Sequence, residues 1–166
     1  MNNIPSWLTL KEAPTFPKWK LIEVQYIDTD NPCNNGSVNT YTRVENKDGA
    51  YLSSIKVWQE WPGDRASEMT KPITQANDYC GKKYGATFYM SGDSSFDPNK
   101  GQSGPYSFYV DGNSDVVSGA GLPLKRHVQF IFVWRYTENP TPPPTEGHWE
   151  LVDANNRDNP QLKWVV

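Results

Sequence analysis

Features that point to a nucleic-acid or membrane partner are scarce in this sequence. Charged residues make up only 21% of the chain, the net charge is −3, and the longest basic cluster is Lys125, Arg126 and His127. Nucleic-acid binding is not expected, because contacts to phosphates need clustered Lys and Arg side chains. No apolar run approaches the roughly 20 residues that a membrane helix requires, so no membrane insertion is expected.

The first residues also lack the elements of a secretion signal. The segment 1–7 (MNNIPSW) has no basic stretch followed by an apolar one. The chain is therefore either cytosolic or a module of a secreted protein whose leader is not included, and we favour the second interpretation.

Cysteine is rare, and its two occurrences share a setting. Cys33 and Cys80 lie in the polar, turn-rich segments NPCNNG and NDYCGKK. A disulfide could join these two loops, and this would indicate an extracellular or cell-surface protein. A bridge and two free thiols both remain open, because the sequence gives no Cα distance.

Residues for catalysis or metal binding are equally few. His127 and His148 are the only histidines, and neither belongs to a nucleophile motif. The two isolated cysteines do not fit a zinc site, and no carboxylate pair stands out for glycoside hydrolysis. We therefore predict a protein that is not an enzyme and needs no cofactor.

One run of oxygen-bearing side chains is a weak calcium candidate. It contains Asp93, Asp97 and Asn99 at alternating positions, as a calcium loop would. Position 104 is glycine where an EF-hand has glutamate, and Pro98 restricts the backbone. Asx turns, in which these side chains bond their own backbone, are the alternative.

Aromatic residues, proline and glycine are abundant instead. The chain has seven Trp, nine Tyr, 14 Pro and 12 Gly in 166 residues. The many Pro and Gly residues indicate frequent turns and short strands. A core of this size needs only some of the large rings. Others are expected at the surface, where they can stack on sugars, nucleobases or a protein partner.

Alternating apolar and polar residues predict the strands. Residues 104–135 contain two such segments around a Gly- and Ser-rich loop, and we expect them to form the central hairpin. Further strands are predicted over 18–28, 38–45 and 50–61, with a hairpin turn at 46–49. In the loop of the first unit, Asp115 is expected to accept hydrogen bonds from nearby backbone N–H groups; direct ligand binding is the alternative.

The fold class follows from these strands and from the absence of a convincing long helix. Strands spaced by turn signals predict an all-β protein, an antiparallel immunoglobulin-like β-sandwich with a long inserted loop at 64–103. Within that loop we expect a strand near 86–90 and a helical turn near 74–80. The predicted organisation is an irregular leader (1–17) docked by Trp7 and Phe16, a sandwich (18–138), a proline-rich linker (139–145) and a strand-like tail (146–166).

The segments GPYS (104–107) and SDVVSG (114–119) are the most specific parts of a wider pattern over residues 18–136. This pattern resembles immunoglobulin-like or prealbumin-like accessory modules. Such modules are found beside glycoside hydrolases and cell-wall enzymes in secreted proteins of bacteria such as the Chloroflexi. The resemblance implies a fold, an extracellular setting and a role in holding glycan, and it implies no catalytic residue. The cysteines and the tail lie outside it.

Exposed aromatic rings beside polar groups are the candidates for a sugar site. Such rings stack on pyranose faces while carboxylates and amides bind the hydroxyls. The candidate ligand-binding residues are Trp58, Glu60, Trp61, Asp64, Tyr84, Tyr89 and Tyr109. In the alternative interpretation, Trp58 covers a loop, Trp61 packs at the core and the tyrosines of the insertion hold it against the sheet.

These observations favour a non-catalytic carbohydrate-binding accessory module whose partner is a polysaccharide or cell-wall glycan. The alternative is an extracellular structural or adhesive module without a sugar site. In that case the terminal segments (1–17 and 145–166) would mediate self-association by packing on neighbouring copies.

Overall fold

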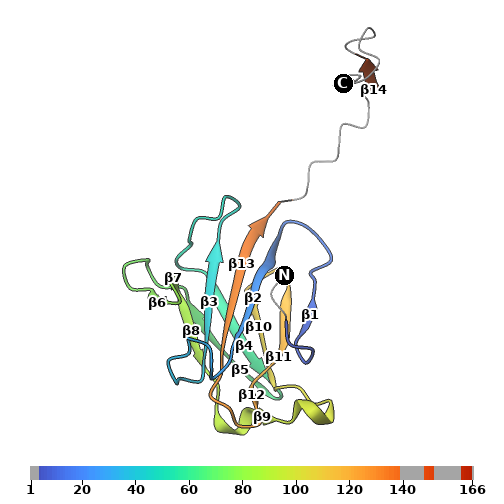
Figure 1. Cartoon of the computed structure of the whole chain (residues 1–166). Coiled ribbons are helices and arrows are strands. Elements are labelled where there is room, and N and C mark those ends of the chain that lie inside the picture. The colour runs from blue at the N-terminus through green and yellow to red at the C-terminus, as the bar shows by residue number, and fades with distance from the viewer. Residues whose placement is uncertain (1–3, 139–147, 152–161, 166) are drawn as a thin grey trace.

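The computed structural model describes residues 4–138, 148–151 and 162–165 and shows a β-sandwich (Figure 1). Two sheets pack against each other, one ordered β1-β11-β10-β4-β5 and the other β2-β13-β3-β8. The described residues contain no α-helix, and none of their short helical turns has the length and apolar character needed to cross a membrane. The predicted all-β fold is confirmed. Its immunoglobulin-like connectivity stays a prediction.

The strand bounds are as follows. The five-stranded sheet contains β1 (Thr9–Lys11), β4 (Lys56–Trp61), β5 (Asp64–Met69), β10 (Tyr106–Val110) and β11 (Val116–Ala120). The four-stranded sheet contains β2 (Lys18–Ile27), β3 (Asn39–Glu45), β8 (Ala86–Tyr89) and β13 (Gln129–Thr137). The short elements are β6 (Asn77–Tyr79), β7 (Lys82–Tyr84), η1 (Gly92–Ser94), β9 (Ser95–Phe96), η2 (Pro98–Lys100) and β12 (Leu122–Pro123).

The core lies between the sheets and is built from the alternating aromatic side chains. Phe108 of β10 contacts Phe88 of β8 and Phe132 of β13, with ring centroids 5.6 and 5.3 Å apart. Trp134 is fully buried beside Phe132. Burying each of these side chains contributes on the order of 1.5–3 kcal/mol, so the alternation that predicts the strands also stabilises the sandwich.

β13 is buried on both faces, because a second apolar cluster covers the outer face of its sheet. The hairpin β6–β7 lies beside β3 and β8 (Figure 1). It places Tyr79 on Tyr41 in a stacked pair with centroids 3.9 Å apart, and Ile131 belongs to the same cluster. A disulfide joins Cys33 to Cys80 across it, with Cα atoms 5.5 Å apart. Of the two possibilities left open by the sequence, the structure shows the bridge.

The segment expected as a long inserted loop is largely made of strands. β5 extends the first sheet, β6 and β7 cover the second, and β8 completes it, which confirms the strand predicted near 86–90. The helical turn predicted near 74–80 is wrong, because β6 occupies 77–79 in extended conformation. Extended backbone is what brings Tyr79 onto Tyr41, and this burial outweighs the polar composition of the segment.

The pairing of the predicted strands also differs from expectation. β10 pairs with β11 and β4, whereas β13 lies in the other sheet, so residues 104–135 do not form one hairpin. The turn at 46–49 is confirmed, with the Gly49 N–H donating to Asn46 O at 3.1 Å and a φ of +85° at Gly49. Its strands then separate into different sheets. β3 pairs with β13 in parallel, which no hairpin turn could have indicated.

The leader is docked, as expected, but it is not wholly irregular. β1 pairs with β11 at the edge of the five-stranded sheet. Trp7 packs edge-on against Tyr26 and Phe96, with centroids 5.6 and 5.8 Å away. Phe16 is 39% exposed and contributes less to docking.

The tail contributes two strands, β14 (His148–Leu151) and β15 (Leu162–Val165), which pair antiparallel with each other. They agree with the strand-like pieces predicted for 146–166. Among the described residues they join neither sheet of the sandwich. The predicted linker at 139–145 lies outside the described residues.

A buried ion pair joins the residue before β11 to the leader and the start of β2, about a hundred residues earlier in the chain. Lys18 Nζ lies 3.2 Å from Asp115 Oδ1, and the two side chains are 4% and 1% exposed. The Asp115 carboxylate also accepts the backbone N–H groups of Ala13 and Leu21 at 2.8 and 3.0 Å. The prediction that Asp115 accepts backbone N–H groups is therefore confirmed, but the donors come from the leader and β2 rather than from nearby residues.

Glu45 on β3 forms a second ionic network. Its carboxylate accepts hydrogen bonds from Arg43 Nε and Arg135 Nη2, each at 2.7 Å. Burial by itself acts to raise the pKa of Glu45, but the hydrogen bonds from the two arginines outweigh it and hold the pKa below its ordinary value of 4.5. The network therefore links the stability of the second sheet to pH.

We expect Glu45→Gln to lower the free energy of unfolding by about 1–2 kcal/mol at pH 7, because both arginines lose a charged acceptor while staying partly exposed. A depressed carboxylate pKa stabilises the folded state above the ordinary pKa and ceases to do so as pH falls through the folded value. Urea denaturation of both proteins from pH 7 to pH 3 checks this. A difference in unfolding free energy between the two proteins that stays constant below pH 4.5 would contradict this prediction.

Candidate functional site

Trp58 and Trp61 lie on opposite faces of β4 and do not form one aromatic platform. Trp58 is directly opposite Tyr109 on β10, on the outer face of the five-stranded sheet. Trp61 packs edge-on against Tyr106, a buried core residue, with centroids 5.9 Å apart. A sugar cannot stack on both rings at once, because the sheet separates them.

The outer-face group around Trp58 is held by its own internal contacts. Trp58 Nε1 donates to Asp111 Oδ1 at 2.7 Å, and the Arg65 guanidinium lies 4.3 Å from the ring centroid. Tyr109 Oη donates to Glu60 Oε2 at 2.8 Å. Burial and this hydrogen bond raise the pKa of Tyr109 above its ordinary value. A ligand here would have to displace a cation from the ring and compete with paired carboxylates.

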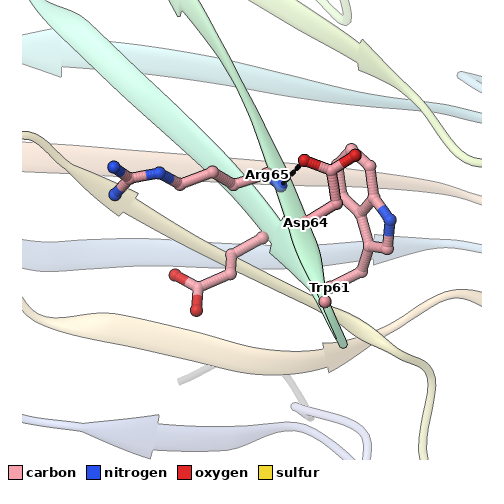
Figure 2. A pocket seen from close by; sticks show the side chains of 5 residues that line it. Trp61, Asp64 and Arg65 are labelled. Atoms are coloured by element: carbon pink, nitrogen blue, oxygen red, sulfur yellow. Dashed lines mark hydrogen bonds between the residues drawn. The ribbon is translucent and has the colours of Figure 1, made fainter.

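The turn between β4 and β5 forms an open hollow of about 440 Å³ next to Trp61 and Asp64. Figure 2 shows Trp61 and Asp64 on one side of this hairpin, while Arg65 projects to the other. The Asp64 carboxylate accepts the Arg65 backbone N–H at 2.8 Å, which stabilises the turn. The polar side chains point away from one another and do not converge on the hollow. The hollow therefore lacks the converging polar groups that a site for one sugar needs.

Tyr84 is unavailable to any ligand, which corrects the prediction that it binds one. Its side chain is 1% exposed inside the cluster beneath the β6–β7 hairpin. Burial raises the pKa of Tyr84 to about 12. The ring instead holds the inserted segment against the sheet, which is the alternative that the sequence left open.

Tyr89 is the exposed aromatic among the predicted residues. It is 66% exposed at the end of β8 and lies directly opposite Asn39 of β3. Both residues line a groove of about 350 Å³. The end of β8 that carries Tyr89 lies toward β9 and β12 (Figure 1). The groove is lined by Gly36, Ser37, Val38, Asn39, Tyr89, Met90, Gly92, Leu122 and His127.

This groove combines an apolar floor with a polar rim. Its apolar lining residues are Val38, which is partly exposed, and Met90 and Leu122, which are 0% and 4% exposed and belong to the core behind it. His127 Nδ1 lies 3.2 Å from Gly36 O, which orients the imidazole at the rim. An aromatic wall, an apolar floor and a few polar groups are the usual composition of a small-molecule site. Within the predicted set, only Tyr89 belongs to it.

Hydrogen bonds from Gln129 on β13 hold the loop that lines one side of the groove. Gln129 Nε2 donates to Ser37 O at 2.8 Å and to Asn35 Oδ1 at 3.0 Å. The same loop carries Cys33 of the disulfide. These contacts fix the backbone that lines one side of the groove, so binding there needs little further ordering.

Sequence reasoning missed Asn39, Ser37 and His127 as groove residues. They belong to no motif, and only the pairing of β3 with β8 places Asn39 beside Tyr89. An exposed tyrosine next to a polar strand residue could have been found only if that pairing were known.

Of the three weak calcium candidates, Asp97 is bonded to the backbone. Asp97 caps η2 by accepting the Asn99 N–H at 3.0 Å, and Lys100 lies 3.6 Å from its other oxygen. The residues that the structure describes include no group of three His, Cys, Asp or Glu side chains that could hold a metal ion. Asp97 therefore forms the Asx turn of the alternative interpretation, and calcium binding by the run stays a prediction.

The chemistry available in the Tyr89 groove is stacking and hydrogen bonding. Ser37 and His127 both line it, but among the described residues the Ser37 hydroxyl accepts from Gln129 Nε2 at 3.2 Å, and His127 Nδ1 lies 3.2 Å from Gly36 O, so no hydrogen bond joins them as a nucleophile and base. Comparison of the chain with protein-family models, with curated proteins and with solved structures finds no match, so a functional assignment depends on this geometry.

Proposed function

We propose that the protein is a non-catalytic carbohydrate-binding module whose site is the groove beside Tyr89. The observation that carries the proposal is the 66% exposure of Tyr89 beside a hollow whose lining combines apolar and polar residues. An aromatic ring this exposed loses water contact on binding and stacks on the C–H face of a pyranose, while rim groups bind its hydroxyls.

Its setting is proposed to be extracellular, on a polysaccharide or a cell-wall glycan. The Cys33–Cys80 disulfide supports this, because disulfides persist in oxidising compartments. The disulfide also fixes the loop of residues 31–37, part of which lines the groove, so the same covalent link serves the fold and the proposed site.

Replacing Tyr89 with alanine is expected to weaken binding to the preferred insoluble polysaccharide by about tenfold or more, equivalent to about 1.4 kcal/mol. The measurement is depletion of the protein from solution by cellulose, xylan, chitin and peptidoglycan. Because Tyr89 is exposed, the substitution leaves the core intact, and the thermal midpoint should change little.

Ile73→Ala is the matched control, since Ile73 is 51% exposed and lies outside the groove lining. It should leave binding unchanged. Trp58→Ala is measured in parallel. Loss of binding in this variant but not in Tyr89→Ala would move the site to the outer sheet face, and no depletion by any polysaccharide would refute carbohydrate binding altogether.

The alternative proposal, a structural or adhesive module, is favoured by one observation. Trp58, Tyr109 and Arg65 lie together on the outer face of the five-stranded sheet, and these three residue types dominate the energetic centres of protein interfaces. Self-association through the terminal segments remains part of this proposal. Sedimentation or light scattering that shows a monomer at high concentration would count against it.

A further inference from the structure

We infer that the Tyr89 groove selects a sugar bearing an acetamido group, an N-acetylhexosamine, over a plain glucose or xylose unit. The inference rests on the proposed function, because it names the ligand class of the same site. Three observations carry it: an unpartnered carboxamide, a partly apolar lining that includes Val38, and the lack of carboxylates, lysines or arginines in that lining.

The carboxamide is that of Asn39. Its neighbours in the preceding loop are already engaged, since Asn35 Nδ2 donates to Tyr41 Oη and Asn34 Oδ1 accepts from Gln129 Nε2, both at 3.1 Å. The Asn39 side chain has no hydrogen-bond partner among the residues that the structure describes, and it borders the groove. It therefore presents one N–H donor and one carbonyl acceptor side by side, which is the complement of an acetamido C=O and N–H.

The position of Asn39 relative to the stacking ring fits the same ligand. Asn39 and Tyr89 are directly opposite residues of β3 and β8, so their side chains leave the same face of the sheet. Directly opposite Cβ atoms are about 4.5–5.5 Å apart, which is within the width of one pyranose ring with its substituent. One sugar unit can thus stack on Tyr89 while its acetamido group reaches Asn39.

The floor accommodates the methyl group of the acetamide. Val38 is the partly exposed apolar residue of the lining, next to the buried Met90 and Leu122, and a hydroxyl against it would lose its hydrogen bonds. The residues lining the groove include no Asp, Glu, Lys or Arg, which favours a neutral sugar over a uronic acid. The acetamido class is the one that uses all three features together.

The test is isothermal titration of the full chain with chitotetraose and, as a probe of equal length without acetamido groups, cellotetraose. We expect chitotetraose to bind about tenfold more tightly, because a site built to pair a polar group rejects the analogue that lacks it. Asn39→Ala should reduce this preference to about threefold or less and leave cellotetraose binding unchanged. Ser67→Ala, on the exposed edge strand β5, is the control and should preserve the preference.

The outcomes separate the inference from the proposed function. Equal or tighter binding of cellotetraose overturns the acetamido preference and leaves carbohydrate binding standing. A chitotetraose preference that survives Asn39→Ala overturns the role of the carboxamide. Binding of neither probe, nor of any polysaccharide in the depletion assay, overturns both. Parallel titration with peptidoglycan glycan strands, which carry the same acetamido group, distinguishes a cell-wall source from a chitin-like one.

Discussion

Replacing Asp115 with alanine is expected to lower the free energy of unfolding by about 3–5 kcal/mol, the largest effect that we predict for a single residue. The side chain is 1% exposed and pairs with Lys18, which is 4% exposed. Its removal leaves the buried ammonium with only the exposed carboxylate of Glu12, 3.7 Å away, as a counter-charge. It also leaves two backbone N–H groups, those of Ala13 and Leu21, without their carboxylate acceptor.

Conservative variants separate the contribution of the ion pair to stability from that of the backbone hydrogen bonds. Asp115→Asn keeps one acceptor oxygen but loses the charge, so its cost should be smaller than that of alanine. Lys18→Met should cost the least, because the Asp115 carboxylate keeps both backbone donors. Lys18 also donates to Ala13 O at 3.1 Å, so some loss remains. The loss of unfolding free energy is therefore expected to be largest for Asp115→Ala, smaller for Asp115→Asn and smallest for Lys18→Met.

Urea denaturation at pH 7 measures the three differences. Protease sensitivity of residues 1–17 gives a second readout, because the Ala13 bond holds the leader on the sandwich. A loss below about 1 kcal/mol for Asp115→Ala would show that the pair is hydrated in solution, and a cost for Lys18→Met above that for Asp115→Ala would reverse the proposed roles of the two residues.

Removing the disulfide with the double variant Cys33→Ser/Cys80→Ser is expected to lower the free energy of unfolding by about 2–4 kcal/mol. The two cysteines are 47 residues apart, so the bridge closes a long loop in the unfolded chain. The hairpin β6–β7 would then be held by noncovalent contacts alone. These are the buried rings of Tyr79 and Tyr84 and polar contacts such as Arg43 Nη1 to Lys83 O at 3.0 Å and Lys82 Nζ to Glu23 Oε2 at 2.7 Å.

Chemical denaturation of the double variant checks this expectation, and the wild-type protein under reducing conditions is its control. The two should unfold at the same midpoint. Hydrogen exchange should show faster opening of residues 77–84 than of β13 in both samples. An unchanged midpoint would mean that the hairpin and the loop of residues 31–37 are held without the bridge. Unequal midpoints would assign part of the effect to the serine substitutions.

The bridge also connects this prediction to the proposed site. Ser37 lines the groove and lies four residues beyond Cys33, in a loop that Gln129 anchors from β13. Reduction should therefore weaken binding at the groove in addition to lowering stability. It should leave the outer face around Trp58 unaffected, because that face belongs to the other sheet.

The candidate site could be predicted from sequence only in part. The sequence points to Tyr89 because aromatic rings crowd a polar segment, where they either project outward to line a groove or hold the segment against the sheet. The same reasoning selected Tyr84, which is buried, because a two-residue turn returns β7 beneath β6 and onto the sheet. The composition of a segment does not indicate which of its aromatic rings faces a neighbouring layer. No local sequence pattern indicates that the β6–β7 hairpin covers the outer face of the four-stranded sheet.

The sequence by itself determined the all-β class, the existence of β2, β3, β8, β10 and β13, and the turn at 46–49, because a period of two and the φ needed at Gly49 are local properties. Only the tertiary structure decided which strands pair, that Asp115 binds donors 94 and 102 residues away, and that Asn39 stands beside Tyr89. These contacts depend on burial between sheets, and burial is a property of the assembled layers that no stretch of chain carries alone.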